Sequence, residues 1–202
     1  MNTSRGTLRQ YLVAARAMLL FTLVLGVGYT AVITGIGQLT MNATANGSIV
    51  QEDGKVVGSS LIGQSFTDAD GNTLPQWFQS RPSAAGDGYD GAASSGSNRG
   101  PNSDILLTDV NARAARIMEE DGVSRDQIPA DALTASGSGL DPDISVAYAQ
   151  LQAKRIAEAR GIDVSTVQKL IASTMQDRDL GYLGEPRVNV LALNLALAKM
   201  GD

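Results

Sequence analysis

The chain has 202 residues, of which 43% are hydrophobic, 4% aromatic and 18% charged, and its formal net charge is −5. It contains no histidine and no cysteine, which excludes disulfides, thiolate or imidazole metal sites, Ser-His-Asp triads and Cys-His dyads. The acidic balance and low aromatic content also argue against a nucleic-acid partner, because such partners call for basic stripes and stacking platforms.

The N-terminal part predicts one membrane-spanning helix. No charged residue occurs between Arg16 and Glu52, and residues 17–36 form an uninterrupted apolar run. At about 1.5 Å per residue this run covers the roughly 30 Å of bilayer hydrocarbon. Because Arg5, Arg9 and Arg16 all lie on its N-terminal side, the positive-inside rule places the N-terminus in the cytoplasm. The expected boundaries are a cytoplasmic segment 1–10, a transmembrane helix 11–39 and an extracytoplasmic domain 40–202.

A cleaved signal peptide is the alternative to an anchor. The small residues Ala43 and Ala45 flank Thr44 in the manner of a cleavage site. The apolar run, however, exceeds the roughly 7 to 15 residues of a signal-peptide core. We therefore expect the helix to be retained as an anchor in contact with membrane lipid.

Small residues recur along this predicted helix. Thr22, Gly26, Thr30 and Thr34 follow one another at intervals of four, a spacing that lets a second helix approach closely. The alternative is that Gly and Thr are simply common in membrane helices. The four residues are candidates for contact with a partner helix.

The remainder predicts one α+β domain with a short β region followed by about four helices. Residues 48–59 read as a hairpin that turns at Asp53-Gly54, and Asp70-Gly71 predicts a second turn. Apolar periodicity and caps indicate helices that begin after Asn102 or Ser103, at about Ile144, after Asp163 and at Asn189. In the first of them Asp109 and Arg113 have the spacing of an ion pair. The last is apolar on nearly all sides, so Asn194 needs hydrogen-bond partners inside the core.

Residues 80–100 combine a linker-like composition with side chains that linkers rarely carry. Gly and Ser dominate the stretch, yet it also contains Arg81, Tyr89 and Arg99. We expect an ordered loop in which these three side chains are bound by the domain itself or by a partner subunit. The alternative is an ordered loop that serves only its own fold.

No catalytic motif is complete. Gly91 and Gly96 have the P-loop glycine spacing, but Ser97-Asn98 stands where Lys followed by Ser or Thr is required. A Ser-Lys hydrolase stays open as an alternative because four lysines are present, although no motif pairs one with a serine. We expect no catalytic residues and no metal site.

Three separated stretches carry a resemblance to a known family. They are SRPSAAGDGYDGAASSGSNRGP at 80–101, TASGSGLDPDIS at 134–145 and LGEPRVNVLALNLAL at 183–197. In this order after an N-terminal anchor, they closely resemble the C subunit of the Kdp-type bacterial potassium-transporting P-type ATPase, over nearly the whole chain.

The resemblance implies an accessory, non-catalytic subunit of an inner-membrane complex. Its implied partners are a channel-like potassium-translocating subunit and a P-type ATPase catalytic subunit, and its implied role is in assembly and coupled activity. It also implies a higher ATP affinity of the ATPase subunit, with a glutamine implicated that corresponds here to Gln152. We expect a structural role for Gln152 ahead of direct nucleotide contact, because the charge rule puts it on the side without ATP. Asp143 and Met175-Gln176-Asp177 depart from residues frequent in relatives, so no imidazole-dependent role is expected there.

The charge distribution suggests one further function. The 16 basic residues include the three before the apolar run, so the part after it has 13 basic against 21 acidic residues, a net charge of −8. An acidic domain over the outer mouth of a cation pump raises the local cation concentration. The alternative for the charge is that these carboxylates only keep the domain soluble. The alternative for the function as a whole is a signal-anchored extracytoplasmic binding protein.

Overall fold

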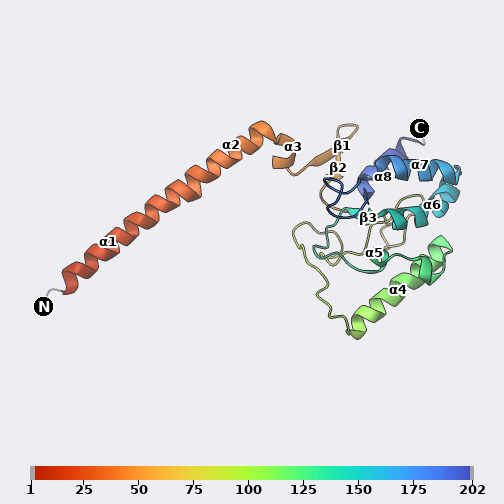
Figure 1. Cartoon of the computed structure of the whole chain (residues 1–202), viewed down its shortest axis with the longest axis horizontal. Coiled ribbons are helices and arrows are strands. Elements are labelled where there is room, and N and C mark those ends of the chain that lie inside the picture. The colour runs from red at the N-terminus through yellow and green to blue at the C-terminus, as the bar shows by residue number, and fades with distance from the viewer. Residues whose placement is uncertain (1–2, 201–202) are drawn as a thin grey trace. The chain divides into compact units, whose positions relative to one another are not determined.

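The computed structural model describes residues 3–200, which form two units that meet after Ile49. The first unit is a continuous helical rod, drawn in red and orange in Figure 1. It consists of α1 (Thr3–Phe21), the π-helix η1 (Thr22–Tyr29) and α2 (Thr30–Thr40), followed by the short α3 (Asn42–Ala45). Residues 7–40 are long and apolar enough to cross a membrane, and nearly all their side chains are exposed. The predicted spanning helix is therefore present.

Polar side chains mark the end of this rod. Met41 leaves helical geometry with φ of −138° and ψ of 48°. The amide groups of Asn42 and Asn46 each donate to the side-chain oxygen of Gln38 at 3.0 Å. These bonds close the last turns before the chain enters the domain.

The domain begins with the predicted hairpin, β1 (Ile49–Glu52) and β2 (Lys55–Ser59). Asp53 and Gly54 have φ values of 50° and 74°, the two left-handed conformations that a type I′ turn requires. The Asp70-Gly71 turn is also present, where Asp68 Oδ1 accepts from the backbone N–H groups of Asp70 and Asn72.

Four longer helices follow, as the periodicity predicts. They are α4 (Asp104–Asp121), α6 (Val146–Arg160), α7 (Val164–Thr174) and α8 (Val190–Ala198), with η2 (Arg125–Gln127) and α5 (Ala130–Leu133) as short additions. The side chains of Ser103, Asp163 and Asn189 each accept a hydrogen bond from the first turn that follows, as N-caps do. Gly161 ends α6 in the left-handed conformation.

A second antiparallel sheet corrects one sequence-based boundary. Strand β3 (Asp143–Ser145) pairs with β4 (Arg187–Asn189), with Ile144 opposite Val188. The second long helix therefore starts at Val146 rather than at about Ile144, with Ser145 as its cap. The pairing joins segments more than 40 residues apart in sequence, so local periodicity cannot reveal it.

The core lies between α4, α6, α7 and α8. Its fully buried side chains include Ile156 of α6, Ile171 of α7 and Leu193 and Leu197 of α8, all 0% exposed. Asn194 finds the partners predicted for it: its amide oxygen accepts from Phe78 N–H at 2.9 Å and its amide nitrogen donates to Phe78 C=O at 3.0 Å.

The expected Asp109–Arg113 ion pair is absent among the described residues. Arg113 Nη1 instead donates to the Leu133 carbonyl at 2.9 Å. A backbone acceptor on α5 thus replaces the neighbouring carboxylate, and the bond holds α5 against α4.

Candidate functional site

Residues 80–100 form an ordered loop that lies against residues 134–145. Ser95 N–H and Ser94 Oγ both donate to the Ser138 carbonyl, at 2.9 and 3.0 Å. Gly139 allows this approach, because a Cβ there would lie 2.6 Å from Ser95 O and 2.7 Å from Ala85 N. Its φ of +67° also favours glycine. Residues 80–100 and 134–145, two of the three stretches that carry the family resemblance, therefore pack on each other.

The domain itself binds two of the three side chains singled out in this loop. Arg81 Nη1 forms an ion pair with Asp141 Oδ2 at 2.8 Å, and its Nη2 donates to Thr134 O at 3.3 Å. The Tyr89 hydroxyl donates to the Arg81 carbonyl, which closes the loop on itself. Burial raises the pKa of Tyr89 to about 12, so the hydroxyl stays a donor at neutral pH. Arg99 is different: it is exposed and makes no hydrogen bond or ion pair to any residue from 3 to 200.

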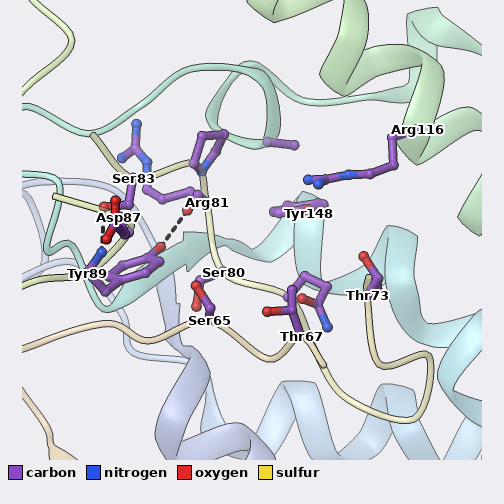
Figure 2. A pocket seen from close by; sticks show the side chains of 14 residues that line it. Ser65, Thr67, Thr73, Ser80, Arg81, Ser83, Asp87, Tyr89, Arg116 and Tyr148 are labelled. Atoms are coloured by element: carbon purple, nitrogen blue, oxygen red, sulfur yellow. Dashed lines mark hydrogen bonds between the residues drawn. The ribbon is translucent and has the colours of Figure 1, made fainter. Parts of the chain in front are cut away.

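The same loop forms one wall of a polar pocket of about 210 Å³ (Figure 2). Ser80, Arg81, Ser83, Asp87 and Tyr89 line it from the loop. The other walls come from residues 65–73, from Arg116 of α4 and from Ala132 and Tyr148 of α5 and α6. No sequence pattern indicates this pocket, because its polar residues occur singly and are spread over five segments.

Gln152 lies in a buried polar network beside this pocket. Its side chain is 0% exposed. Its Oε1 accepts from Gln79 N–H at 2.7 Å and from Arg155 Nη2 at 2.8 Å, while its Nε2 donates to Gln79 C=O at 3.2 Å. Every polar atom of the amide is thus occupied, and contact with a nucleotide would first have to break these bonds.

Arg155 connects this network to two further segments. Its Nε pairs with Asp121 Oδ1 at the end of α4 at 2.8 Å, and its Nη1 donates to Pro75 O at 2.7 Å and to Trp77 O at 3.2 Å. Burial raises the pKa of Asp121, and the Arg155 charge offsets part of that rise. The guanidinium therefore clamps α4, α6 and residues 75–79 together.

Comparison with known proteins identifies the family. The family model described as "K+-transporting ATPase, c chain" matches residues 11–199. This chain belongs to that family. It is 49% identical over 193 residues to a potassium-transporting ATPase KdpC subunit of Mycobacterium bovis, covering 95% of this chain and 99% of that protein. KdpC subunits of Gemmatimonas aurantiaca and Beijerinckia indica are 52% and 51% identical, over 94% and 90% of this chain and 91% and 89% of theirs.

Membership in the KdpC family makes the chain a subunit of a potassium-transporting ATPase. Residues 3–200 contain one helix that is long and apolar enough to cross a membrane, as in a single-pass membrane protein. The candidate helix contacts Thr22 and Gly26 lie in η1, and Thr30 and Thr34 lie in α2, all exposed. The π-helical segment, whose hydrogen bonds run from i to i+5, thus coincides with part of the small-residue stripe. Contact with a second helix there stays a prediction.

Asp143, which was expected to depart from the family pattern, has a partner in the structure. Asp143 Oδ2 pairs with Arg187 Nε at 3.1 Å across the β3–β4 sheet. Burial and the neighbouring Asp141 raise the pKa of Asp143, and Arg187 opposes that rise. The carboxylate thus has a structural partner at this position.

Among the lysines, Lys154 and Lys199 pair with Glu158 and Glu52 rather than with a serine.

Proposed function

We propose that this chain is a non-catalytic accessory subunit that anchors in the inner membrane with its N-terminus in the cytoplasm. Its domain would stand on the extracytoplasmic side, dock on the channel-like subunit and stabilise the complex with the P-type ATPase catalytic subunit. The observation that carries this proposal is the exposed apolar helix found within residues 3–200. Its uncharged run begins after Arg16, and a folded domain follows it in a KdpC-family chain.

The loop 80–100 supports a docking role. Its backbone is held by the domain, yet Arg99 remains exposed and unpaired within the described chain. A guanidinium presented on a pre-organised loop loses little conformational entropy when a partner carboxylate or carbonyl binds it. Arg99 is therefore our first candidate contact with the channel-like subunit, and Arg81 and Tyr89 hold the loop that presents it.

An effect on the ATPase subunit's affinity for ATP would then be indirect. Gln152 is buried and hydrogen-bonded through both its side-chain oxygen and its side-chain nitrogen, which supports a role in holding the domain together rather than in touching nucleotide. A firmly docked domain can favour one conformation of its partner, and any ligand that prefers that conformation then binds more tightly.

The acidic surface would add an effect on potassium entry. The carboxylates of Asp68, Asp70, Asp87 and Asp90 are exposed, and none forms an ion pair within residues 3–200. Changing all four to asparagine should weaken apparent potassium affinity at low ionic strength and have little effect at high salt, because salt screens exposed charge. Unchanged potassium affinity at low ionic strength would refute this part of the proposal.

Two experiments test the main proposal. Co-purification in mild detergent should yield two larger membrane proteins with the wild-type chain, and Arg99→Gln should reduce their yield while Arg125→Gln, a substitution outside the loop, should not. Because the chain has no cysteine, single substitutions Ser4→Cys, which precedes residues 7–40, and Lys154→Cys each provide one thiol for an impermeant reagent in intact cells. Labelling at Lys154→Cys alone supports the orientation, and labelling at Ser4→Cys alone refutes it.

A further inference from the structure

The pocket lined by the 80–89 segment is polar, and two of its lining side chains carry polar groups without partners. Tyr148 of α6 is only 4% exposed and lines the pocket, yet its hydroxyl makes no hydrogen bond to any of residues 3–200. The Nε atom of Arg81 is also buried without a partner. Buried polar groups in proteins are satisfied in nearly all cases, so each such group calls for an explanation.

Both of these unpartnered groups are hydrogen-bond donors. An arginine nitrogen cannot accept a hydrogen bond at all. Burial and the nearby Asp121 raise the pKa of Tyr148, so its hydroxyl keeps its proton at neutral pH. Arg81 Nε therefore needs an acceptor atom, and the protonated Tyr148 hydroxyl can donate to another.

The rest of the lining adds positive charge and further hydroxyl groups. Arg116 extends from α4 toward Tyr148 (Figure 2), and its only ion pair within the described chain is a long one, 3.9 Å to Glu120. The hydroxyl groups of Ser65, Thr67 and Thr73 form no hydrogen bonds within residues 3–200. One carboxylate, that of the exposed Asp87, belongs to the lining. The lining thus offers several hydroxyl groups and two guanidinium groups, of which that of Arg81 already pairs with Asp141.

We infer that this pocket binds a small oxyanion, of the size of phosphate or a short carboxylate, whose oxygens accept hydrogen bonds from the Tyr148 hydroxyl and the Arg116 guanidinium. A guanidinium can bind such an anion through two parallel N–H donors. The volume of about 210 Å³ lies below the roughly 300 to 1,000 Å³ of pockets for drug-sized molecules, so the ligand must be small. Phosphate chemistry has two sources, the free ion and a lipid headgroup.

Calorimetric titration of the full chain in a neutral detergent tests the inference. The probes are inorganic phosphate, acetate and glycerol phosphate, each at constant ionic strength against chloride as reference. We expect saturable binding of one anion per chain with a dissociation constant below about 1 mM. Tighter binding of glycerol phosphate than of phosphate assigns the site to a lipid headgroup, and the reverse order assigns it to the free ion.

Matched variants locate the binding. Tyr148→Phe removes one hydroxyl, and Arg116→Gln removes one half-exposed charge; each should weaken binding about tenfold, as loss of a hydrogen bond to a charged group does. The controls are Tyr182→Phe and Arg99→Gln, which remove the same groups from exposed positions outside the pocket and should leave binding unchanged.

A measurement on the unaltered chain guards against variants that misfold. Phosphate should slow modification of Arg116 by an arginine-directed dicarbonyl reagent, read by peptide mass, and should not slow that of Arg99. The inference is overturned if none of the three anions binds more strongly than chloride, because water alone then fills the pocket. It is equally overturned if binding persists unchanged in both Tyr148→Phe and Arg116→Gln, because the anion then sits elsewhere.

Discussion

Replacing Asp121 by leucine should strongly destabilise the domain. The carboxylate and its partner Arg155 are 3% and 7% exposed in their side chains and 2.8 Å apart, so the substitution leaves a guanidinium buried without its counter-charge. Loss of one partner of a buried ion pair costs about 3–5 kcal/mol. That is a large share of the roughly 5–15 kcal/mol that stabilises a typical domain.

The second half of a double-mutant cycle should not restore stability. In many buried pairs, replacing both partners by apolar residues is neutral. Here Arg155 also donates to the carbonyls of Pro75 and Trp77, which Asp121→Leu/Arg155→Leu leaves without those donors. Each of these lost hydrogen bonds costs about 0.5–1.5 kcal/mol. The double variant should therefore remain less stable than the wild type.

Urea unfolding of the full chain in mild detergent measures these effects, with Trp77 as the reporter. It is the only tryptophan, and the Arg160 guanidinium lies 4.4 Å from its ring centroid, so its fluorescence follows the domain rather than the membrane helix. With a urea slope of about 2 kcal/mol/M, Asp121→Leu should lower the midpoint by roughly 2 M. Lys154→Leu, next to Arg155 but 72% exposed, is the control and should shift it little. Equal shifts for the two variants would refute the clamp.

Three further predictions concern the candidate site. Gly139→Ala should destabilise the domain and expose residues 80–100 to protease, because its Cβ would lie 2.6 Å from Ser95 O. Gly137→Ala is the control, because a Cβ there would have no atom within 4 Å. Equal cleavage of the two variants would contradict the packing of the loop on Gly139. The raised pKa of Tyr89 means that the fold holds its proton more tightly than the unfolded chain, so stability should fall as pH rises from about 10 to about 12. Across that pH range the urea midpoint of Tyr89→Phe should fall less than that of the wild type. An identical fall in both proteins would show that the Tyr89 hydroxyl does not cause it. Gln152→Leu should lower the urea midpoint by about 0.5–1.5 M, because Gln79 and Arg155 lose partners; a weaker ATP affinity of the complex with unaltered domain stability would instead favour direct nucleotide contact.

Local signals in the sequence predicted the elements well. Asp53-Gly54 indicates the hairpin because only certain residues tolerate two consecutive left-handed conformations. Ser103, Asp163 and Asn189 indicate helix starts because their side chains can satisfy free backbone N–H groups. The apolar sequence of α8 indicated that this helix is buried and that Asn194 needs hydrogen-bond partners there. It did not indicate that Phe78 supplies them.

Contacts between distant segments escaped prediction for a physical reason. The β3–β4 pairing, the Asp121–Arg155 clamp and the pocket around Tyr148 all depend on how the helices pack, and a short strand or a lone polar side chain carries no periodicity. Arg113 shows the limit of local rules even within a helix. The spacing to Asp109 allows an ion pair, but a carbonyl on α5 lies within reach and binds the guanidinium instead.

The place of α8 in the chain bears on how the domain is made. Leu193, Asn194 and Leu197 are buried in the core, and Asn194 bonds to a residue 116 positions earlier. During synthesis, the backbone of Phe78 therefore cannot gain this partner until 116 further residues have been added. A contact between residues so far apart in sequence forms late, after the intervening helices have been made.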